Sequence, residues 1–103
     1  MTSHPDLKAV FATNDQMALG AAEAVAARNL TGKVAIVGID ATWEAVRAVQ
    51  AGNLAADIAM YPEQLGSRSV EAAIKAARRQ PLPKSIGTDQ ALVTKENAAA
   101  FLK

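Results

Sequence analysis

The chain has 103 residues, enough for one domain with one modest core, and a domain of this size buries roughly two-thirds of the surface of its unfolded chain. Half of the residues are apolar but only 4% are aromatic, so the core must be built from Ala, Val, Leu and Ile. The 11 basic and 10 acidic residues leave no net field that would attract nucleic acid or an anionic membrane, and the absence of cysteine excludes disulfides, thiolate metal sites and a cysteine nucleophile.

The first segment of the chain predicts a strand, a turn and a helix. Residues 7–12 form a short apolar run that ends at residues 13–15 (TND), whose polar side chains can accept hydrogen bonds from the first backbone N–H groups of a helix. Residues 16–28 consist largely of alanine and other strong helix formers, and Gly32 follows as a stop signal.

The next segment predicts a second strand and a second helix. Residues 33–39 form an unbroken run with several β-branched side chains, which is typical of a strand covered on both faces of a parallel sheet, and the run ends at Asp40. Thr42 is a suitable N-cap for a helix over residues 43–51, and Gly52 is a suitable stop.

A third strand and a third helix follow. Residues 54–61 alternate between two unlike sets of side chains, which is the period of two expected of a strand. Pro62 is favoured in the first turn of a helix and begins a helix over residues 62–80. Residues 91–94 predict a last strand, and the tail is a short, weak helical segment. One face of the third helix is apolar and needs a cover; it comprises Val70, Ala73, Ile74 and Ala77.

The predicted order β-α-β-α-β-α-β indicates an α/β fold, a partial doubly wound parallel sheet with right-handed crossovers. No apolar stretch approaches the roughly 20 residues that span a bilayer, and the start of the chain carries no export signal. Any doubly wound domain would share these features, so function has to be sought at the strand ends.

Polar side chains follow the first two predicted strands. Asn14 and Asp15 follow the first, and Asp40 follows the second, so a parallel sheet would place them at the same edge. A carboxylate accepts from two hydroxyls, and an amide both donates and accepts, which suits a polyhydroxylated ligand. The alternative is that Asn14 and Asp15 only cap the helix.

The residues give little support to an enzymatic function. His4 lies in a terminal loop without partners for a triad, and neither a phosphate-binding glycine loop nor a metal-ligand set accompanies Asp15 and Asp40. Trp43 either lines a pocket or packs at the start of its helix. We therefore expect a binding protein that needs no cofactor and no metal, not an enzyme.

Three strings of the sequence resemble the C-terminal part of the ribose-binding-protein family, the type I periplasmic binding proteins: HPDLKAVFATNDQMALGAAEAV, VAIVGID and AGNLAADIAMYPEQLG. The resemblance covers nearly the whole chain. FATNDQMALG and VGID are also similar to the effector-binding domains of LacI-type repressors, whereas LAADIAMYPEQLG is more like the transport branch.

The resemblance implies a small carbohydrate bound between two lobes, a periplasmic location, and docking of the loaded protein on the membrane permease of an ABC transporter. It assigns ligand binding to Asn14 in FATND and to Asp40 in VGID. Met60 stands where ribose binders have a hydrogen-bonding Gln at the hinge, and a thioether accepts only weakly. This difference favours a different or deoxygenated sugar, or another polyol-like ligand, unless Met60 only packs.

By the same resemblance, residues 1–60 are the latter half of the C-terminal lobe, residues 61–83 a helix that normally packs on an N-terminal lobe, and residues 84–103 a C-terminal strand and tail. The resemblance makes the chain a fragment, and we expect the isolated chain to self-associate through the uncovered helix. Three classes stay open: a solute-binding fragment of an importer, an effector-domain fragment of a LacI-type regulator, and an assembly module derived from either.

Overall fold

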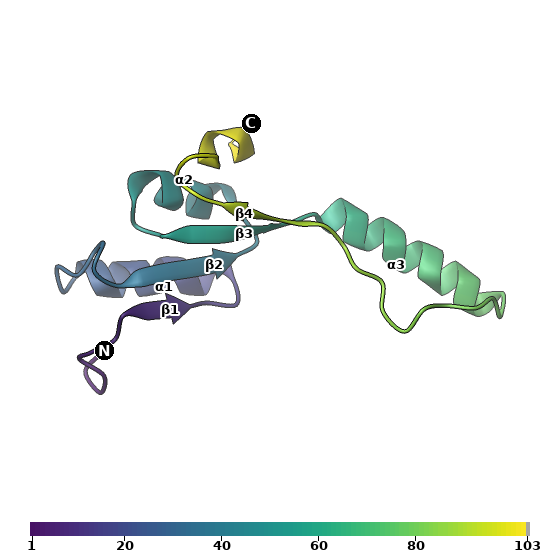
Figure 1. Cartoon of the computed structure of the whole chain (residues 1–103), viewed down its shortest axis with the longest axis horizontal. Helices are drawn as coiled ribbons and strands as arrows, with labels where there is room; N and C mark the ends of the chain where they lie inside the picture. Colours follow the sequence, from purple (N-terminus) through teal and green to yellow (C-terminus); the bar gives the residue numbers. More distant parts are fainter. Residues whose placement is uncertain (103) are drawn as a thin grey trace. The chain divides into compact units, whose positions relative to one another are not determined.

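The computed structural model describes residues 1–102 and contains seven regular helices and strands with a final 3-10 turn (Figure 1). The elements are β1 (Ala9–Phe11), α1 (Asp15–Ala26), β2 (Ala35–Ile39), α2 (Trp43–Ala51), β3 (Ala56–Met60), α3 (Pro62–Ala77), β4 (Gln90–Val93) and η1 (Ala98–Phe101). The order β-α-β-α-β-α-β predicted from the sequence is confirmed.

The chain divides into two compact units. Unit 1 comprises Met1–Ala59 and the chain from Ala91 onward, and unit 2 comprises Met60–Gln90. Strands β3 and β4 are the two places where the chain passes from one unit to the other.

Unit 1 is built on a sheet with the strand order β1-β2-β3-β4. β1 pairs with β2 in parallel, with Phe11 opposite Val37, and β2 pairs with β3 in parallel, with Ile39 opposite Ile58. Helix α1 packs against β1 and β2, and η1 packs against α2. The parallel pairing places the carboxyl ends of β1, β2 and β3 at one edge of the sheet.

The core of unit 1 consists of small and medium aliphatic side chains, as the composition predicts. Its fully buried members include Ala18, Ile36, Val46, Val49, Leu54 and Val93. Burial of one such branched side chain contributes about 1.5–3 kcal/mol, and this contribution holds α1 and α2 on the sheet.

The ends of the helices follow from local chemistry. Helix α2 has the predicted bounds; the Thr42 hydroxyl oxygen accepts from the Ala45 N–H at 3.4 Å, and Gly52 ends the helix at φ 87°. Helix α3 begins at the predicted Pro62 but ends at Ala77, before the predicted end at residue 80, because Arg79 turns to φ 53°.

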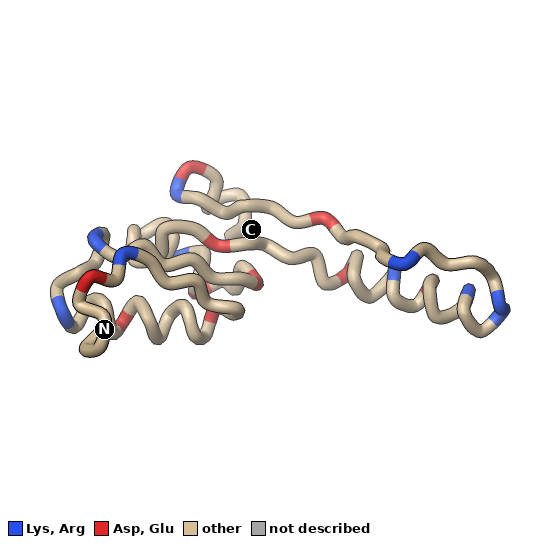
Figure 2. Tube along the Cα trace, turned by 60° about the horizontal axis from the view of Figure 1, so that its bottom comes forward, with Lys and Arg blue, Asp and Glu red and all other residues tan. Residues whose placement is uncertain are grey.

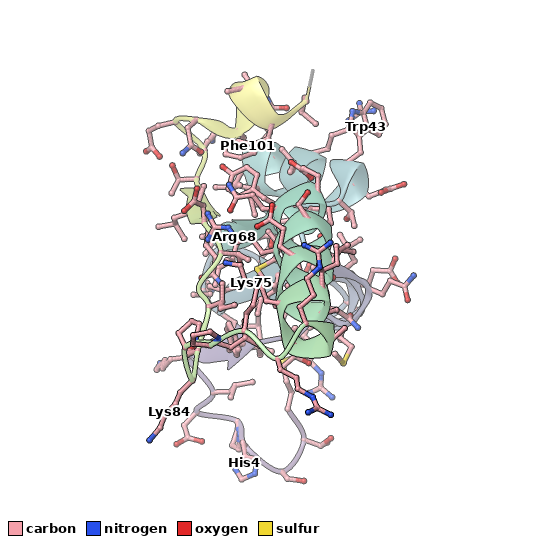
Figure 3. All side chains as sticks on the ribbon, turned by 90° about the vertical axis from the view of Figure 1, so that its right-hand side faces the viewer. His4, Trp43, Arg68, Lys75, Lys84 and Phe101 are labelled. Carbon is pink, nitrogen blue, oxygen red and sulfur yellow. The ribbon has the colours of Figure 1, made fainter. Side chains whose placement is uncertain are left out.

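Unit 2 consists of α3 and the segment that returns along it. The Gln64 side chain donates to Asp89 Oδ2 at 2.8 Å and accepts from the Asp89 N–H at 3.0 Å, and the Arg68 guanidinium donates to the Gly87 carbonyl. Figure 3 labels Arg68 and Lys75 of this helix, and Lys84 extends from the return segment. A hollow of about 280 Å³ lies between α3 and the return segment, next to Leu65.

No residue of α3 is buried, although the helix carries an apolar stripe. Val70 is 60% exposed and Ile74 is 46% exposed, so the face that the sequence marks as needing a cover is open in this chain. Lys and Arg gather in the last turn of α3 and just beyond it (Figure 2), where they complement the negative end of the helix dipole. Within residues 1–102, no helix has the length and apolarity needed to cross a membrane.

Candidate ligand-binding site

The sequence-predicted residues Asn14 and Asp40 lie at the same edge of unit 1. Asn14 directly precedes α1 after strand β1, and Asp40 directly follows strand β2. Because β1 and β2 are parallel neighbours, the two residues stand at adjacent carboxyl ends. Asn14 is half-buried and Asp40 is exposed, so the Asp40 side chain is open to solvent at this edge.

Asn14 caps helix α1. Its Oδ1 accepts from the Met17 N–H at 2.9 Å, and its backbone is extended at φ −156°. The capping interpretation is therefore correct for Asn14, but it uses only the acceptor of the amide. The Nδ2 group remains as a donor for a ligand hydroxyl, so capping and binding are compatible.

Asp40 lies in a turn whose backbone has two consecutive positive φ angles. Asp40 has φ 125° and Ala41 has φ 54°, and such conformations cost non-glycine residues about 1–3 kcal/mol each. The Asp40 N–H donates to the Ile58 carbonyl at 2.9 Å, and the Thr42 N–H donates to Asp15 Oδ2 at 2.7 Å. Strand β3 and helix α1 thus hold the two ends of the turn.

Two buried carboxyl groups lie beneath this turn. Asp15 is 1% exposed and Asp57 is 0% exposed. Burial, together with the hydrogen bond and the negative charge of Asp15, raises the pKa of Asp57 from 3.8 to about 7. Asp57 Oδ1 accepts from the Ile58 N–H at 2.7 Å, whereas the buried oxygens Asp15 Oδ1 and Asp57 Oδ2 accept no hydrogen bond within residues 1–102.

Gly38 provides the space for the carboxyl pair. A Cβ at this position of β2 would lie 2.7 Å from Asp15 Oδ1, 3.0 Å from the Ala18 Cβ and 3.4 Å from Asp57 Oδ1. The first distance is shorter than any normal contact. The glycine in this strand therefore allows α1 and its carboxylate to approach the sheet closely.

Sequence reasoning missed Asp57 and assigned Asp15 only to capping or to the ligand. The alternation of residues 54–61 identified two unlike faces, but the inner face of β3 is the one that carries Asp57 and Ala59. The available signal was Gly38 within a β-branched strand, which indicates a close approach by another group.

The other two residues of interest lie at the ends of elements. Met60 is the half-buried last residue of β3 and belongs to unit 2, so only Asn14 and Asp40 of the three predicted binding residues lie in one unit. Trp43, at the start of α2, is 56% exposed and does not pack into the core (Figure 3). The Arg47 guanidinium lies 4.5 Å from the centroid of its ring, a cation–π contact.

Known proteins similar to this chain bind small solutes. Residues 1–81 match the model of the periplasmic binding protein domain family. The ribose import binding protein of Escherichia coli (strain K12) is 43% identical over 98 residues, covering 93% of this chain and 32% of the relative. The chain therefore spans about a third of the length of the curated relatives it matches.

Two solved structures of ABC transporter solute binding proteins have the same fold. The protein from Mycobacterium smegmatis with bound glycerol has a TM-score of 0.83 and 39% identity, covering 99% of this chain and 35% of that protein. The protein from Actinobacillus succinogenes with bound D-allose has a TM-score of 0.78 and 32% identity, covering 96% of this chain and 35% of that protein. With its fold and its sequence both matched, this chain belongs to the periplasmic binding protein domain family.

Proposed function

We propose that this chain provides one wall of a carbohydrate-binding cleft in the solute-binding protein of an ABC importer. The observation that carries the proposal is the placement of Asn14 and Asp40 at adjacent carboxyl ends of parallel strands, with the Asp40 turn held by Asp15. Ligands of open parallel sheets bind at this edge. The relatives named for ribose and D-allose support a sugar as the ligand class.

The chemistry of the two residues fits a polyol. The Asp40 carboxylate accepts from two neighbouring hydroxyls, and the Asn14 Nδ2 group donates to a third oxygen. Ribose, D-allose and glycerol, the ligands named for the relatives, share vicinal hydroxyls. Met60 stands where the resemblance has a hydrogen-bonding Gln in ribose binders, and a thioether accepts only weakly, so we infer a ligand other than ribose.

The importer is favoured over the LacI-type regulator as the parent of this chain. The curated relatives are named as import or periplasmic binding proteins, for ribose and for D-allose among others. These names also support non-covalent binding without catalysis and a periplasmic location. As part of the same proposal, the loaded protein docks on a membrane permease.

The open face of α3 leads to a second proposal, on how this chain assembles. In this proposal, residues 1–60 are the lobe half that carries the site, and residues 61–83 contain helix α3, whose natural cover is the N-terminal lobe of a longer protein. The relatives are about three times as long as this chain, which leaves ample sequence for such a lobe. When the chain is isolated, a second copy covers the exposed Val70 and Ile74 instead.

Calorimetry on the longest natural protein that contains this sequence tests the proposed function. Ribose, D-allose, glycerol and myo-inositol are titrated in turn, and we expect micromolar binding of at least one sugar or polyol that is lost in Asp40→Asn. Asp6→Asn, which removes an exposed carboxylate from the N-terminal loop, is the matched control. Equal affinity of the Asp40→Asn protein and the control for the bound ligand would contradict the assignment of this edge.

A further inference from the structure

We propose that Asp15 and Asp57 share one proton, and that this carboxyl pair is the positioning element that fixes the turn of residues 40–42 and so sets where Asp40 presents its carboxylate. The inference rests on the proposed function for the role of Asp40. The pair itself does not contact the ligand; it acts through the backbone of the turn.

Backbone N–H groups of the turn lie close to both carboxyl groups of the pair. Asp15 Oδ2 accepts from the Thr42 N–H at 2.7 Å, and the Ala41 N–H lies near enough to Asp57 to stabilise its carboxylate. Two consecutive amides of the turn therefore face the pair. Each carboxyl group has one further oxygen, Asp15 Oδ1 and Asp57 Oδ2, that is buried and accepts no hydrogen bond within residues 1–102.

A single proton shared between the two carboxyl groups accounts for their burial. Two adjacent carboxylates, 1% and 0% exposed, would repel each other and would lack the solvent that stabilises both charges. A carboxyl–carboxylate hydrogen bond joins the two groups with one proton and leaves one negative charge for the amides.

Within residues 1–102, no cationic side chain contributes to the pKa of Asp57. Asp15 on α1 is the charged side chain that faces Asp57, and the adjacent strands β2 and β4 carry no charged residue. Asp40, at the start of the turn, does not contribute to the shift in the pKa of Asp57. The net charge of the pair therefore depends on whether the shared proton is bound.

The turn needs such a support because its backbone is held in an unfavourable conformation. Asp40 and Ala41 both have positive φ angles, and the Thr42–Asp15 and Asp40–Ile58 hydrogen bonds oppose the relaxation of these angles. When the shared proton is lost, repulsion separates the carboxyl groups and the amides of the turn lose their fixed acceptors. The Asp40 carboxylate then moves with the turn.

The test uses the ligand-free chain in a His4→Gln background, which removes the one imidazole. Carboxyl ¹³C resonances of Asp15 and Asp57, amide resonances of Ala41 and Thr42, and the fluorescence of Trp43, the single tryptophan, are followed from pH 5 to pH 9. We expect the Asp57 carboxyl, the two amides and the fluorescence to change together with a midpoint near pH 7. Asp57→Asn should abolish the change and keep the amides at their low-pH positions, whereas Asp6→Asn should leave it intact.

Several results would overturn the inference. If the Asp57 carboxyl titrates near pH 7 but the Ala41 and Thr42 amide resonances do not move, the pair is buried but has no positioning role. If Asp57 titrates at an ordinary acidic pH, the two carboxyl groups do not share a proton. Displacement of the transition by excess Ca²⁺ alone would mean that a cation, not a proton, joins the pair. The ¹³C titration of the unsubstituted carboxyls decides the question even if Asp57→Asn fails to fold.

Sugar titrations of the longer protein at pH 6 and pH 8 separate this inference from the proposed function. Weaker sugar binding at pH 8, lost in Asp57→Asn, supports both. If the amide resonances of the turn titrate but the protein binds no sugar at either pH, the proposed function is contradicted. The coupling between the carboxyl pair and the turn is then still supported. If the protein binds sugar but the amide resonances of the turn do not change with pH, only the coupling between the pair and the turn is contradicted.

Discussion

Asp15 Oδ2 accepts a hydrogen bond from the Thr42 N–H at 2.7 Å, which joins the first residue of α1 to the residue that caps α2. The two loops that carry Asn14 and Asp40 are therefore connected through their neighbours and not only through the sheet. A ligand that contacts both residues would bind to one preorganised unit, which lowers the conformational entropy lost on binding.

Gly38→Ala should destabilise the chain by about 1–3 kcal/mol, because the new Cβ would lie 2.7 Å from Asp15 Oδ1 and overpack a region that has no room to expand. Gly20→Ala is the matched control, since nothing lies within 4 Å of a Cβ there and alanine favours a helix interior by about 0.5–1 kcal/mol. Urea denaturation measures both. Equal effects of the two substitutions would mean that Gly38 does not hold α1 close to the sheet.

The stability of the chain should fall as the pH rises from about 5 to about 7. The folded state keeps a proton on Asp57, whose pKa is about 7, while the unfolded state has lost it above its ordinary value of 3.8. Because the folded state binds more protons in this window, the free energy of unfolding decreases with pH there and levels off above pH 7.

Thermal melts across that range measure this slope, since about 1 kcal/mol corresponds to about 4–8 °C in Tm for a domain of this size. Asp57→Asn should flatten the slope, and Asp6→Asn should preserve it. Starting at pH 5 avoids the opposite contribution of Glu96, whose pKa is lowered by the Thr94 hydroxyl. A wild-type Tm that is constant from pH 5 to pH 7 would contradict the raised pKa.

The sequence was sufficient for the order of the elements because their signals are local. Alanine-rich helices, β-branched strands and the caps at Asn14 and Thr42 depend on neighbouring residues, and the structure contains them all. The burial of Asp57 is not a local property. It depends on which face of β3 turns inward and on α1 approaching Gly38, so the proton-sharing pair was visible only in three dimensions.

Asp40→Asn in the longest natural protein that contains this chain should weaken sugar binding by about 2 kcal/mol, roughly 30-fold in Kd, because a charged acceptor of two hydroxyls is replaced by a poorer one. Calorimetry at pH 6, where the turn is held, gives the comparison.

The isolated chain itself should bind only in the millimolar range, because one wall of a cleft leaves most of the ligand surface in water. Micromolar binding by the isolated monomer would contradict the one-wall proposal.

The isolated chain should self-associate through α3, and Ile74→Ser should weaken that association. Val70 and Ile74 are 60% and 46% exposed on a helix with no buried residue, so pairing of two such helices would remove apolar surface that this chain cannot cover by itself. Lys75→Ser is the matched control, because it shortens the neighbouring side chain without reducing the apolar stripe. Light scattering over a concentration series should show that the mean mass of the wild type and of Lys75→Ser rises with protein concentration. For Ile74→Ser, the mean mass should rise only at a higher protein concentration. A wild-type monomer at high micromolar concentration would mean that α3 is stable without a cover, and loss of association in Lys75→Ser alone would place the contact on another face of the helix.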